Sequence, residues 1–362
     1  MIRMPSQLSE IELHESVVIY PSFGYLDHDQ RSWKIKIHGA VYKPCHDSFQ
    51  DRMLVRLLTR AMKTGVHELN SKIFRQRVGS FLAQHERGKR IVIRVGDKRY
   101  RLRSRTRRNG YFSGTLRLST YQAELLYDQG ALQDGWLNFE ILTRRDEQRT
   151  FMGRAQLVGR RGFSVISDID DTIKRSDVPC RSELLANTFL REYESVPGMS
   201  QLYQRWADAG AAFHYVSSSP WQLFQPLDDF RCDDLFPQGS YHLRTLRLKD
   251  PRVLSLLLPT RWNKWSKWRS IRSILRAFPD RRFVLVGDSG ERDPEIYGSA
   301  ARKYPDRIAR IYIRNLAVRS LMGLRREKAF RATPRGLWRI FQDVEQLQND
   351  AAQLRDEVRC LG

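Results

Sequence analysis

The stretch Phe163-Ser-Val-Ile-Ser-Asp-Ile-Asp-Asp-Thr172 decides the fold of the second half of this chain. Its apolar start predicts a buried β-strand, and carboxylates follow where that strand ends. In an open α/β sheet, ligands bind beyond the carboxyl ends of the strands. Asp168 and Asp170, with the Thr172 hydroxyl further on, suit Mg²⁺-dependent phosphoryl transfer, in which one aspartate attacks phosphorus and the other moves protons. Asp-rich turns after strands are also common as N-caps or Asx-turns, so the motif needs support from other segments.

The stretch 213–220, Phe-His-Tyr-Val-Ser-Ser-Ser-Pro, is a second apolar strand, and it ends in hydroxyl side chains. Hydroxyls and backbone amides at such a strand end can donate hydrogen bonds to phosphoryl oxygens. We expect Ser217 to bind phosphate in this way. Ser218 and Ser219 fit the N-cap of a following helix as well as they fit a substrate contact.

The stretch 282–293 is a third apolar strand followed by glycine and acidic residues. Asp288 lies just past this strand, where its carboxylate can complete a Mg²⁺ site with Asp168 and Asp170. Asp293 precedes Pro294 and fits a helix N-cap, because proline is favoured at the first helical position. The same place in the chain allows Asp293 to orient a metal-bound water.

Lys267 comes near the start of a basic helix between the second and third strands. This helix is predicted by apolar residues at helical spacing, namely Ile271, Ile274, Leu275 and Phe278. A cation near a helix N-terminus opposes the helix dipole. The placement therefore indicates an anion that Lys267 neutralises. Lys264 is the competing candidate, and a solvated surface position is the alternative for either lysine.

The order of these segments, acidic strand end, serine strand end, lysine and acidic strand end, resembles the haloacid dehalogenase-like phosphohydrolases. A closer resemblance lies in residues 167–174, 214–221 and 287–297, which are similar to the actin-patch phosphatidate phosphatase family and its bacterial relatives. The resemblance implies a Rossmann-like α/β catalytic domain with a mostly parallel sheet. It also implies Mg²⁺ as the cofactor and a phosphoric monoester hydrolase as the activity.

The resemblance further implies a role for each matching residue. Asp168 would be the nucleophile, Asp170 the general acid and base, Ser217 the phosphate-binding hydroxyl and Lys267 the neutralising cation. The metal would be held by Asp168, the backbone carbonyl of Asp170, Asp288 and Asp293. We expect further substrate contacts from Thr172, Ser218, Ser219 and Arg244. For Arg244 a surface ion pair is the alternative to a phosphate contact.

The chain before residue 160 has a different pattern. Residues 33–42 alternate like a strand, and residues 53–81 carry helical periodicity. Four further short strands are predicted at 91–103, 111–118, 136–143 and 151–158. We therefore expect a β-rich, sandwich-like or barrel-like domain over residues 1–160, with a helical insertion at about 48–84.

Strands and helices alternate from residue 161, which predicts a catalytic domain over residues 161–320 with crossover helices. Between its first two motifs we expect only two helices, at 182–194 and 198–209. A segment this short leaves no room for a large lid, and an open site suits a bulky or membrane-bound phosphate. Residues 321–362 are expected to form a helical extension, with a helix from Leu337 to about Val358.

The formal net charge of +22 is the second informative feature of the 362 residues. Arginines recur at every second position at 99, 101, 103, 105 and 107, which on a strand would form one basic face. Such a face attracts anionic lipid headgroups or, as a weaker alternative, nucleic acid phosphates. A solvated face of a generally arginine-rich protein is an equally good interpretation.

No apolar run approaches the length of a transmembrane span, and four scattered cysteines indicate free thiols in a reducing compartment. We therefore expect a cytoplasmic protein that binds membranes peripherally. The predicted activity is a Mg²⁺-dependent phosphatidate phosphatase with an aspartyl-phosphate intermediate. Two alternatives remain: a phosphatase of a soluble phosphomonoester, and a catalytically inactive protein on the same scaffold that binds nucleic acid or membranes.

Overall fold

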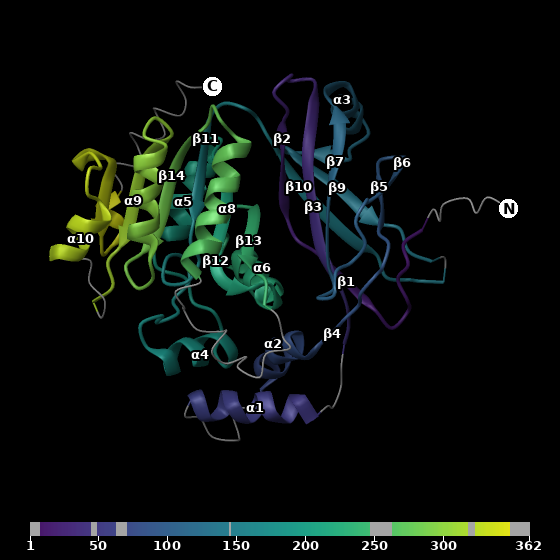
Figure 1. The fold of residues 1–362 in the computed structure, drawn as a ribbon, viewed down its shortest axis with the longest axis horizontal. Coiled ribbons are helices and arrows are strands. Elements are labelled where there is room, and N and C mark those ends of the chain that lie inside the picture. The colour runs from purple at the N-terminus through teal and green to yellow at the C-terminus, as the bar shows by residue number, and fades with distance from the viewer. Residues whose placement is uncertain are drawn as a thin grey trace. The chain divides into compact units, whose positions relative to one another are not determined.

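A computed structural model describes residues 8–44, 49–62, 71–144, 146–246, 263–317 and 323–347. The chain forms two compact units (Figure 1). Unit 1 comprises Met1–Ser48 and Leu82–Gly159, and unit 2 comprises Phe49–Phe81 and Arg160–Gly362. The helical segment Phe49–Phe81 lies between two parts of unit 1 in the sequence, but its contacts place it in unit 2.

Unit 1 is built on one ten-stranded mixed sheet. Seven strands follow one another in the order β1-β3-β2-β10-β9-β5-β6, while β4 and β7 pair with β3 and β8 pairs with β9. Among the described strands of unit 1, only the β2–β10 pairing is parallel. The strands are β1 (Ser16–Ile19), β2 (Ser22–Leu26), β3 (Ser32–Lys43), β4 (Gln84–His85), β5 (Val92–Val95), β6 (Lys98–Arg101), β7 (Tyr111–Ser119), β8 (Leu132–Gln133), β9 (Trp136–Ile141) and β10 (Phe151–Val158).

The strands of unit 1 enclose one apolar core to which β1, β3, β5, β7, β9 and β10 all contribute. Alternating burial along β3 and β9 puts every second side chain into this core. The β-rich class is as predicted, but the described strands are continuous in one sheet, and two separately bonded layers are not seen. A helix that the sequence did not predict, α3 (Thr120–Asp128), begins at a capping box formed by Ser119 and Gln122.

The predicted row of arginines on one strand is wrong. Strand β6 ends at Arg101, and the arginines at 103, 105 and 107 lie in the loop that follows. In this loop Leu102 and Thr106 are buried, and the Thr106 hydroxyl donates a hydrogen bond of 2.6 Å to the carbonyl of Glu86. Arg105 forms an ion pair of 2.7 Å with Glu10. The basic side chains are exposed, but they do not share one strand face.

Unit 2 is a six-stranded parallel sheet in the order β13-β12-β11-β14-β15-β16. The chain starts in the middle at β11, moves outward through β12 and β13, and then crosses to β14 and the other half. This is a doubly wound order, and the direction reverses between β11 and β14. The strands are β11 (Phe163–Ser167), β12 (Ala212–Pro220), β13 (Gly239–Arg244), β14 (Arg282–Asp288), β15 (Ile308–Arg314) and β16 (Trp338–Phe341).

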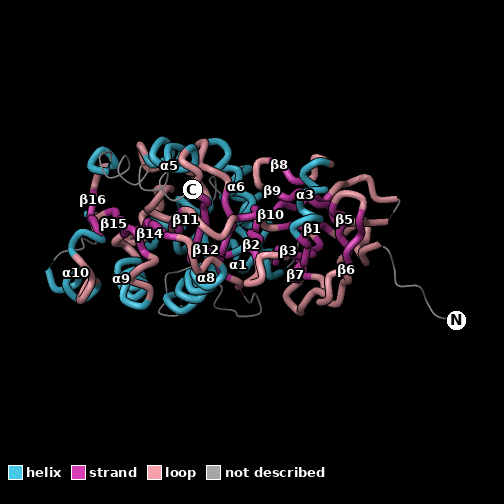
Figure 2. Tube along the Cα trace, turned by 90° about the horizontal axis from the view of Figure 1, so that it is seen from above, coloured by secondary structure: helices cyan, strands magenta, loops and turns pink. Residues whose placement is uncertain are grey.

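Helices cover both faces of this sheet. Figure 2 shows α5 (Met199–Asp208) on one side of the strands and α8 (Asn263–Ala277) with α9 (Asp293–Lys303) on the other. The central strands β11 and β14 are buried almost throughout, as expected for a parallel sheet covered on two faces. The predicted α/β class with a mostly parallel sheet is therefore confirmed for unit 2.

The predicted C-terminal helix is wrong over its first eleven residues. Residues 338–341 form β16, the edge strand beside β15, and Val344–Leu347 form a short 3-10 helix. Residues 338–341 pair in parallel with β15, and this tertiary contact overrides the local helical spacing. A preceding helix, α10 (Gly323–Ala329), lies within the predicted helical extension, although no individual helix was expected there. The rest of the predicted helix lies outside the described residues.

The two helices inserted after β3 are α1 (Phe49–Met62) and α2 (Lys72–Leu82). They pack against α4 (Arg181–Phe189) of unit 2, where the rings of Phe81 and Phe189 lie 5.5 Å apart. The helices predicted at 182–194 and 198–209 correspond to α4 and α5.

Within the described residues, none of the helices is long and apolar enough to cross a membrane. Cys180 and Cys232 are free, as predicted. Cys45 and Cys360 lie outside the described residues.

Candidate active site

Three buried aspartates meet where the sheet of unit 2 changes direction. Asp168 follows β11, Asp288 ends β14, and Asp293 opens α9. Each offers one carboxylate oxygen within 4.8 Å of the others, and the three residues are at most 1% exposed. The sequence predicted this convergence, because the carboxyl ends of neighbouring parallel strands meet at one edge of the sheet.

Lys267 joins this cluster from α8. Its ammonium lies 3.0 Å from Asp168 Oδ1, 2.5 Å from Asp293 Oδ1 and 3.5 Å from Glu291 Oε2. Burial opposes its charge, but the three carboxylates outweigh burial and raise the pKa of Lys267 well above its ordinary value. The predicted neutralising role therefore has a geometric basis. The side chain of Lys264, the competing candidate, is outside the described set.

One lysine cannot balance the carboxylates around it. Burial, followed by repulsion from neighbouring acids, raises the pKa of Asp168 and of Asp288, although Lys267 acts in the opposite direction. Asp168 Oδ2 and Asp288 Oδ2 are buried and have no hydrogen-bond donor. Hard carboxylate oxygens left without donors at one point are what a divalent cation such as Mg²⁺ requires, so these residues fit a metal ion.

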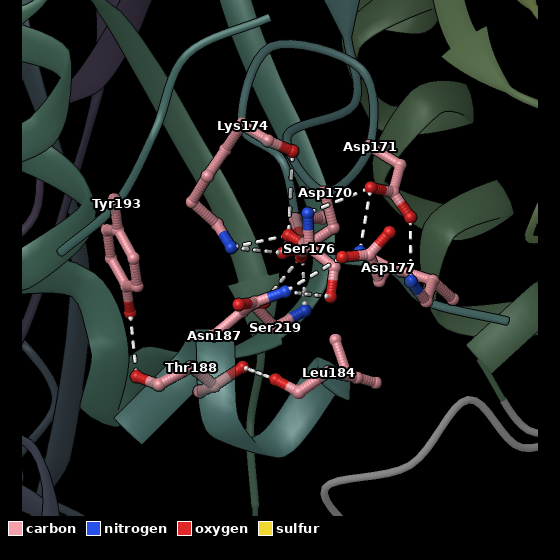
Figure 3. A network of polar contacts seen from close by, with 12 residues as sticks. Asp170, Asp171, Lys174, Ser176, Asp177, Leu184, Asn187, Thr188, Tyr193 and Ser219 are labelled. Atoms are coloured by element: carbon pink, nitrogen blue, oxygen red, sulfur yellow. Dashed lines mark hydrogen bonds and ion pairs between the residues drawn. The ribbon is translucent and has the colours of Figure 1, made fainter. Parts of the chain in front are cut away.

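Asp170 has different surroundings, which Figure 3 shows. One carboxylate oxygen lies 2.9 Å from the ammonium of Lys174 and accepts a hydrogen bond of 2.7 Å from Ser176. The other accepts hydrogen bonds from the hydroxyls of Ser217 (3.1 Å) and Ser219 (2.7 Å). Burial alone would raise the pKa of Asp170, but Lys174 and the hydroxyls outweigh burial and lower it. The carboxylate is thus held in its ionised form, and its side chain is not one of the three that converge on the possible metal site.

The loop that carries Lys174 and Ser176 is fixed by Asp171 (Figure 3). The Asp171 carboxylate accepts hydrogen bonds of 2.7–2.9 Å from the backbone amides of residues 176, 177 and 178. Asp171 itself has a φ of 54°, in the left-handed region that aspartate tolerates better than most residues. The turn after the first motif therefore folds back and places Lys174 beside Asp170.

The serines of the second motif contact carboxylates. Ser217 and Ser219 donate to Asp170, and Ser218 donates a hydrogen bond of 2.9 Å to Glu291. The N-cap interpretation of Ser218 and Ser219 is wrong, since the following 3-10 helix has Pro220 at its N-cap. The N-cap interpretation of Asp293 also fails, because Arg292 caps α9 and Asp293 lies in its first turn.

Two predicted substrate contacts have less defined surroundings. Thr172 is buried and its hydroxyl has no hydrogen-bond partner. Arg244 ends β13 and is half-buried. Burial lowers the pKa of Arg244, while the charge of Glu291 opposes this, so Arg244 is within electrostatic reach of the site.

Three site residues were missed by the sequence analysis: Lys174, Ser176 and Glu291. A signal existed for two of them, because Lys174 follows Asp170 at i+4 and Glu291 follows Asp288 at i+3. The role of Ser176 depends on the return of the loop and has no sequence signal that we can identify.

A small pocket opens beside Asp170, Ser219 and Glu291. The rest of its lining is mostly apolar, with Val178, Leu184, Leu185, Phe189, Pro220 and Leu223. Its cavity volume is only about 30 Å³. The pocket therefore combines charged and apolar lining residues.

The fold and the site define an α/β domain whose acidic centre, at the switch point of a doubly wound sheet, can hold a metal ion. Residues 163–315 match the family described as "Phosphatidate phosphatase APP1, catalytic domain". The match confirms the family resemblance for this segment, which contains the acidic cluster, Lys267 and the serine motif.

Two curated relatives are similar to part of this chain. Phosphatidate phosphatase APP1 of Saccharomyces cerevisiae is 37% identical over 164 residues, or 44% of this chain, and an uncharacterized protein of Schizosaccharomyces pombe is 33% identical over 172 residues, or 46% of this chain. The chain spans only 27% of the length of each relative. A solved β-glucuronidase from Parabacteroides merdae aligns over 84% of this chain and 35% of its own length at 11% identity, but its TM-score of 0.24 is too low to inform the fold.

Proposed function

We propose that this protein is a Mg²⁺-dependent phosphatidate phosphatase or a close lipid-phosphate phosphohydrolase of the haloacid dehalogenase-like type. One observation carries the proposal: Asp168, Asp288, Asp293 and Lys267 converge in a buried cluster inside the segment that matches the phosphatase family. The doubly wound sheet and the positions of the motifs at its strand ends support the superfamily assignment.

The proposed reaction begins with attack on phosphorus by Asp168, whose Oδ2 has no hydrogen-bond donor in the structure. The bond from phosphorus to the leaving oxygen breaks, and an aspartyl phosphate forms. A Mg²⁺ ion held by Asp168, Asp288, Asp293 and the backbone carbonyl of Asp170 would neutralise phosphoryl charge. Lys267 and Ser217 stabilise the same charge from the protein side.

Asp170 acts as acid and then as base in this proposal. The second step requires an ionised Asp170, which its lowered pKa provides, and in that step Asp170 takes a proton from the water that hydrolyses the aspartyl phosphate. For the first step it must carry a proton. The negative charge of an arriving phosphate raises the pKa of a nearby carboxyl group and thereby favours protonation. The proton then passes to the leaving alkoxide.

The apolar lining of the pocket supports a lipid substrate over a small soluble ester. Val178, Leu184 and Phe189 can cover apolar parts of a leaving group that starts beside Asp170. A soluble phosphomonoester remains the second candidate, because the recess is small and the phosphate-binding groups do not distinguish the two. Thr172, Ser218, Ser219 and Arg244 remain proposed substrate contacts.

The test is an assay of phosphate release from phosphatidate in mixed micelles, lysophosphatidate and p-nitrophenyl phosphate, with Mg²⁺ and with a chelator. We expect hydrolysis of phosphatidate that falls as the lipid is diluted in the micelle surface and stops on chelation. Faster turnover of the soluble ester, without dependence on surface dilution, would favour the second candidate. No hydrolysis of any ester with Mg²⁺ would overturn the enzyme proposal and favour an inactive binding protein.

We also propose that exposed arginines of unit 1 attract an anionic membrane surface, as the excess of positive charge suggests. Arg101 and Arg103 are the residues to test, because Arg105 is already paired with Glu10. Replacing both with serine should weaken binding to vesicles containing phosphatidate about 30-fold at low salt, since each basic residue near a membrane contributes roughly 1 kcal/mol.

The matched control for charge is a double substitution of Arg94 and Arg144, which form ion pairs with Glu140 and Asp146. Equal vesicle binding by wild type and the Arg101/Arg103 variant would contradict the membrane proposal. A loss of affinity for nucleic acid instead would assign the surface to that partner.

A further inference from the structure

Lys174 is an almost fully buried cation, and the proposed phosphatase reaction assigns it no step. It is 1% exposed, and its ammonium contacts Asp170 at 2.9 Å and Ser176 at 2.5 Å. It also lies 4.5 Å from the ring centroid of Tyr193, which Figure 3 shows beside it. The electron-rich face of an aromatic ring attracts such a cation and shields it from water. Lys174 thus contacts both the Asp170 carboxylate and the Tyr193 ring.

Tyr193 is held in turn by a residue far away in sequence. The guanidinium of Arg77, in helix α2, lies 3.8 Å from the centroid of the same ring. Arg77 is 5% exposed and donates hydrogen bonds to the carbonyls of Thr188 (2.9 Å) and Arg191 (2.7 Å). The Tyr193 hydroxyl donates to the Thr188 carbonyl as well, at 3.3 Å. Arg77 thus fixes both the ring and the backbone at the end of α4.

We propose that helix α2 positions Asp170 through the chain of contacts Arg77–Tyr193–Lys174. This inference rests on the proposed function, in which Asp170 transfers protons, and adds three positioning residues to it. Arg77 lies outside residues 163–315, the segment that matches the family catalytic domain. The helical insertion is therefore a working part of the catalytic unit.

The effects expected along this chain decrease with distance from Asp170. Lys174→Met removes the cation that holds one carboxylate oxygen and should lower kcat about 100-fold or more, within the range for loss of a positioned proton-transfer group. Tyr193→Leu and Arg77→Met should each lower kcat about 3- to 10-fold, because a cation–π contact is weaker than a buried ion pair. KM should change little, since Ser217 and Lys267, which are proposed to contact the phosphate, are untouched.

One conservative variant and one control variant separate positioning from simple support of the fold. Tyr193→Phe keeps the ring and should retain nearly full kcat, although it loses the hydrogen bond to Thr188. Arg75→Met is the matched control on α2, because it removes the same charge from an exposed position of the same helix. If the contacts form a chain, the Arg77→Met and Tyr193→Leu effects should also be less than additive in the double variant.

The experiment measures kcat and KM of these full-length variants with phosphatidate in mixed micelles. Amide hydrogen exchange across residues 170–178 is measured on the same proteins. We expect Tyr193→Leu and Arg77→Met to lower kcat at constant KM and to speed exchange in this loop, while Tyr193→Phe and Arg75→Met do neither.

Unchanged kcat in Arg77→Met and Tyr193→Leu, with active wild type, would overturn the inference and leave the proposed function intact. If wild type hydrolyses no phosphate ester, the proposed function fails, and hydrogen exchange alone then decides whether α2 orders the loop. Equal exchange in Arg77→Met and wild type would overturn that ordering too.

Discussion

Asp168 shares Lys267 with two other acids, whereas Asp170, two residues further along the chain, has Lys174 and three hydroxyls as partners. The pKa is raised for Asp168 and lowered for Asp170. Both residues are buried, so burial does not account for the difference. The number and sign of the neighbouring charges decide it, and they are consistent with the proposed roles of Asp168 at a cation site and of Asp170 in proton transfer.

The largest effect that tests this comparison is on turnover. Asp168→Asn should abolish hydrolysis, because an amide cannot act as the nucleophile. Asp170→Asn should lower the rate about 10²- to 10⁴-fold, the usual contribution of a positioned acid or base. Steady-state assays of both folded proteins provide the measurement. Appreciable activity of Asp168→Asn would rule out the covalent mechanism.

The same two substitutions should differ in their effect on stability. Asp170→Asn leaves the buried ammonium of Lys174 without its counter-charge, which typically costs about 3–5 kcal/mol. Asp168→Asn removes one of several mutually repelling acids, and Lys267 keeps Asp293 and Glu291 as partners. We therefore expect metal-free Asp168→Asn to be as stable as wild type or more so. Urea unfolding of both variants in a chelator tests this, and equal losses would contradict the contrast.

Addition of Mg²⁺ should sharpen the difference further. A cation that binds only the folded protein stabilises it by about 2.7 kcal/mol at 100 times its Kd. Thermal unfolding should show this gain for wild type and for Asp170→Asn, because the Asp170 side chain is outside the metal cluster. The gain should be smaller for Asp288→Asn. A Mg²⁺ response that Asp288→Asn leaves unchanged would place the ion elsewhere.

The stabilities of the two variants should also diverge with pH. The pKa of Asp168 is raised, so its contribution to stability is full below the ordinary aspartate value of about 3.9 and is lost as pH rises through the folded-state pKa. The lowered pKa of Asp170 gives the opposite sign: its contribution is present above about 3.9 and is lost as pH falls. In a chelator, the free energy of unfolding of Asp168→Asn should increase relative to that of wild type as pH rises. The loss of stability caused by Asp170→Asn should become smaller only at acidic pH.

The smallest effect concerns the hydroxyls around Asp170. Ser219→Ala removes one of the donors and should lower kcat about tenfold, as expected for a hydrogen bond to a charged group. Ser218→Ala is the comparison variant, because Ser218 donates to Glu291 rather than to Asp170, and loss of its proposed substrate contact should change KM more than kcat. An equal loss in both variants would show that the serines act together on the loop and not on Asp170.

The sequence alone determined most of the strand arrangement of unit 2 and the positions of the acidic residues at the strand ends. Apolar runs that end in Asp168, Ser217 and Asp288 predicted three strands with polar residues at their carboxyl ends. Parallel strands bring those ends to one edge of the sheet, so the convergence followed from the strand pattern. Lys267 could be predicted because it follows a helix start, where a cation is otherwise unfavourable.

Local patterns failed where distant contacts outweigh them. The helical spacing after Leu337 gave way to strand pairing with β15, and the period-two arginines left the sheet after Arg101. In both cases the segment is short, and its local preference is smaller than the hydrogen bonds and burial that a neighbouring element offers.

The partners of Asp170 were decided only by the tertiary structure. Sequence placed Asp168 and Asp170 together and could not distinguish their environments. The loop held by Asp171 brings Lys174 and Ser176 back to Asp170, and an inserted helix brings Arg77 to the ring that covers Lys174. The strand pattern therefore determines where the carboxylates lie, while their charge states depend on neighbours that only the folded chain brings within a few ångströms, where electrostatic interactions are strong.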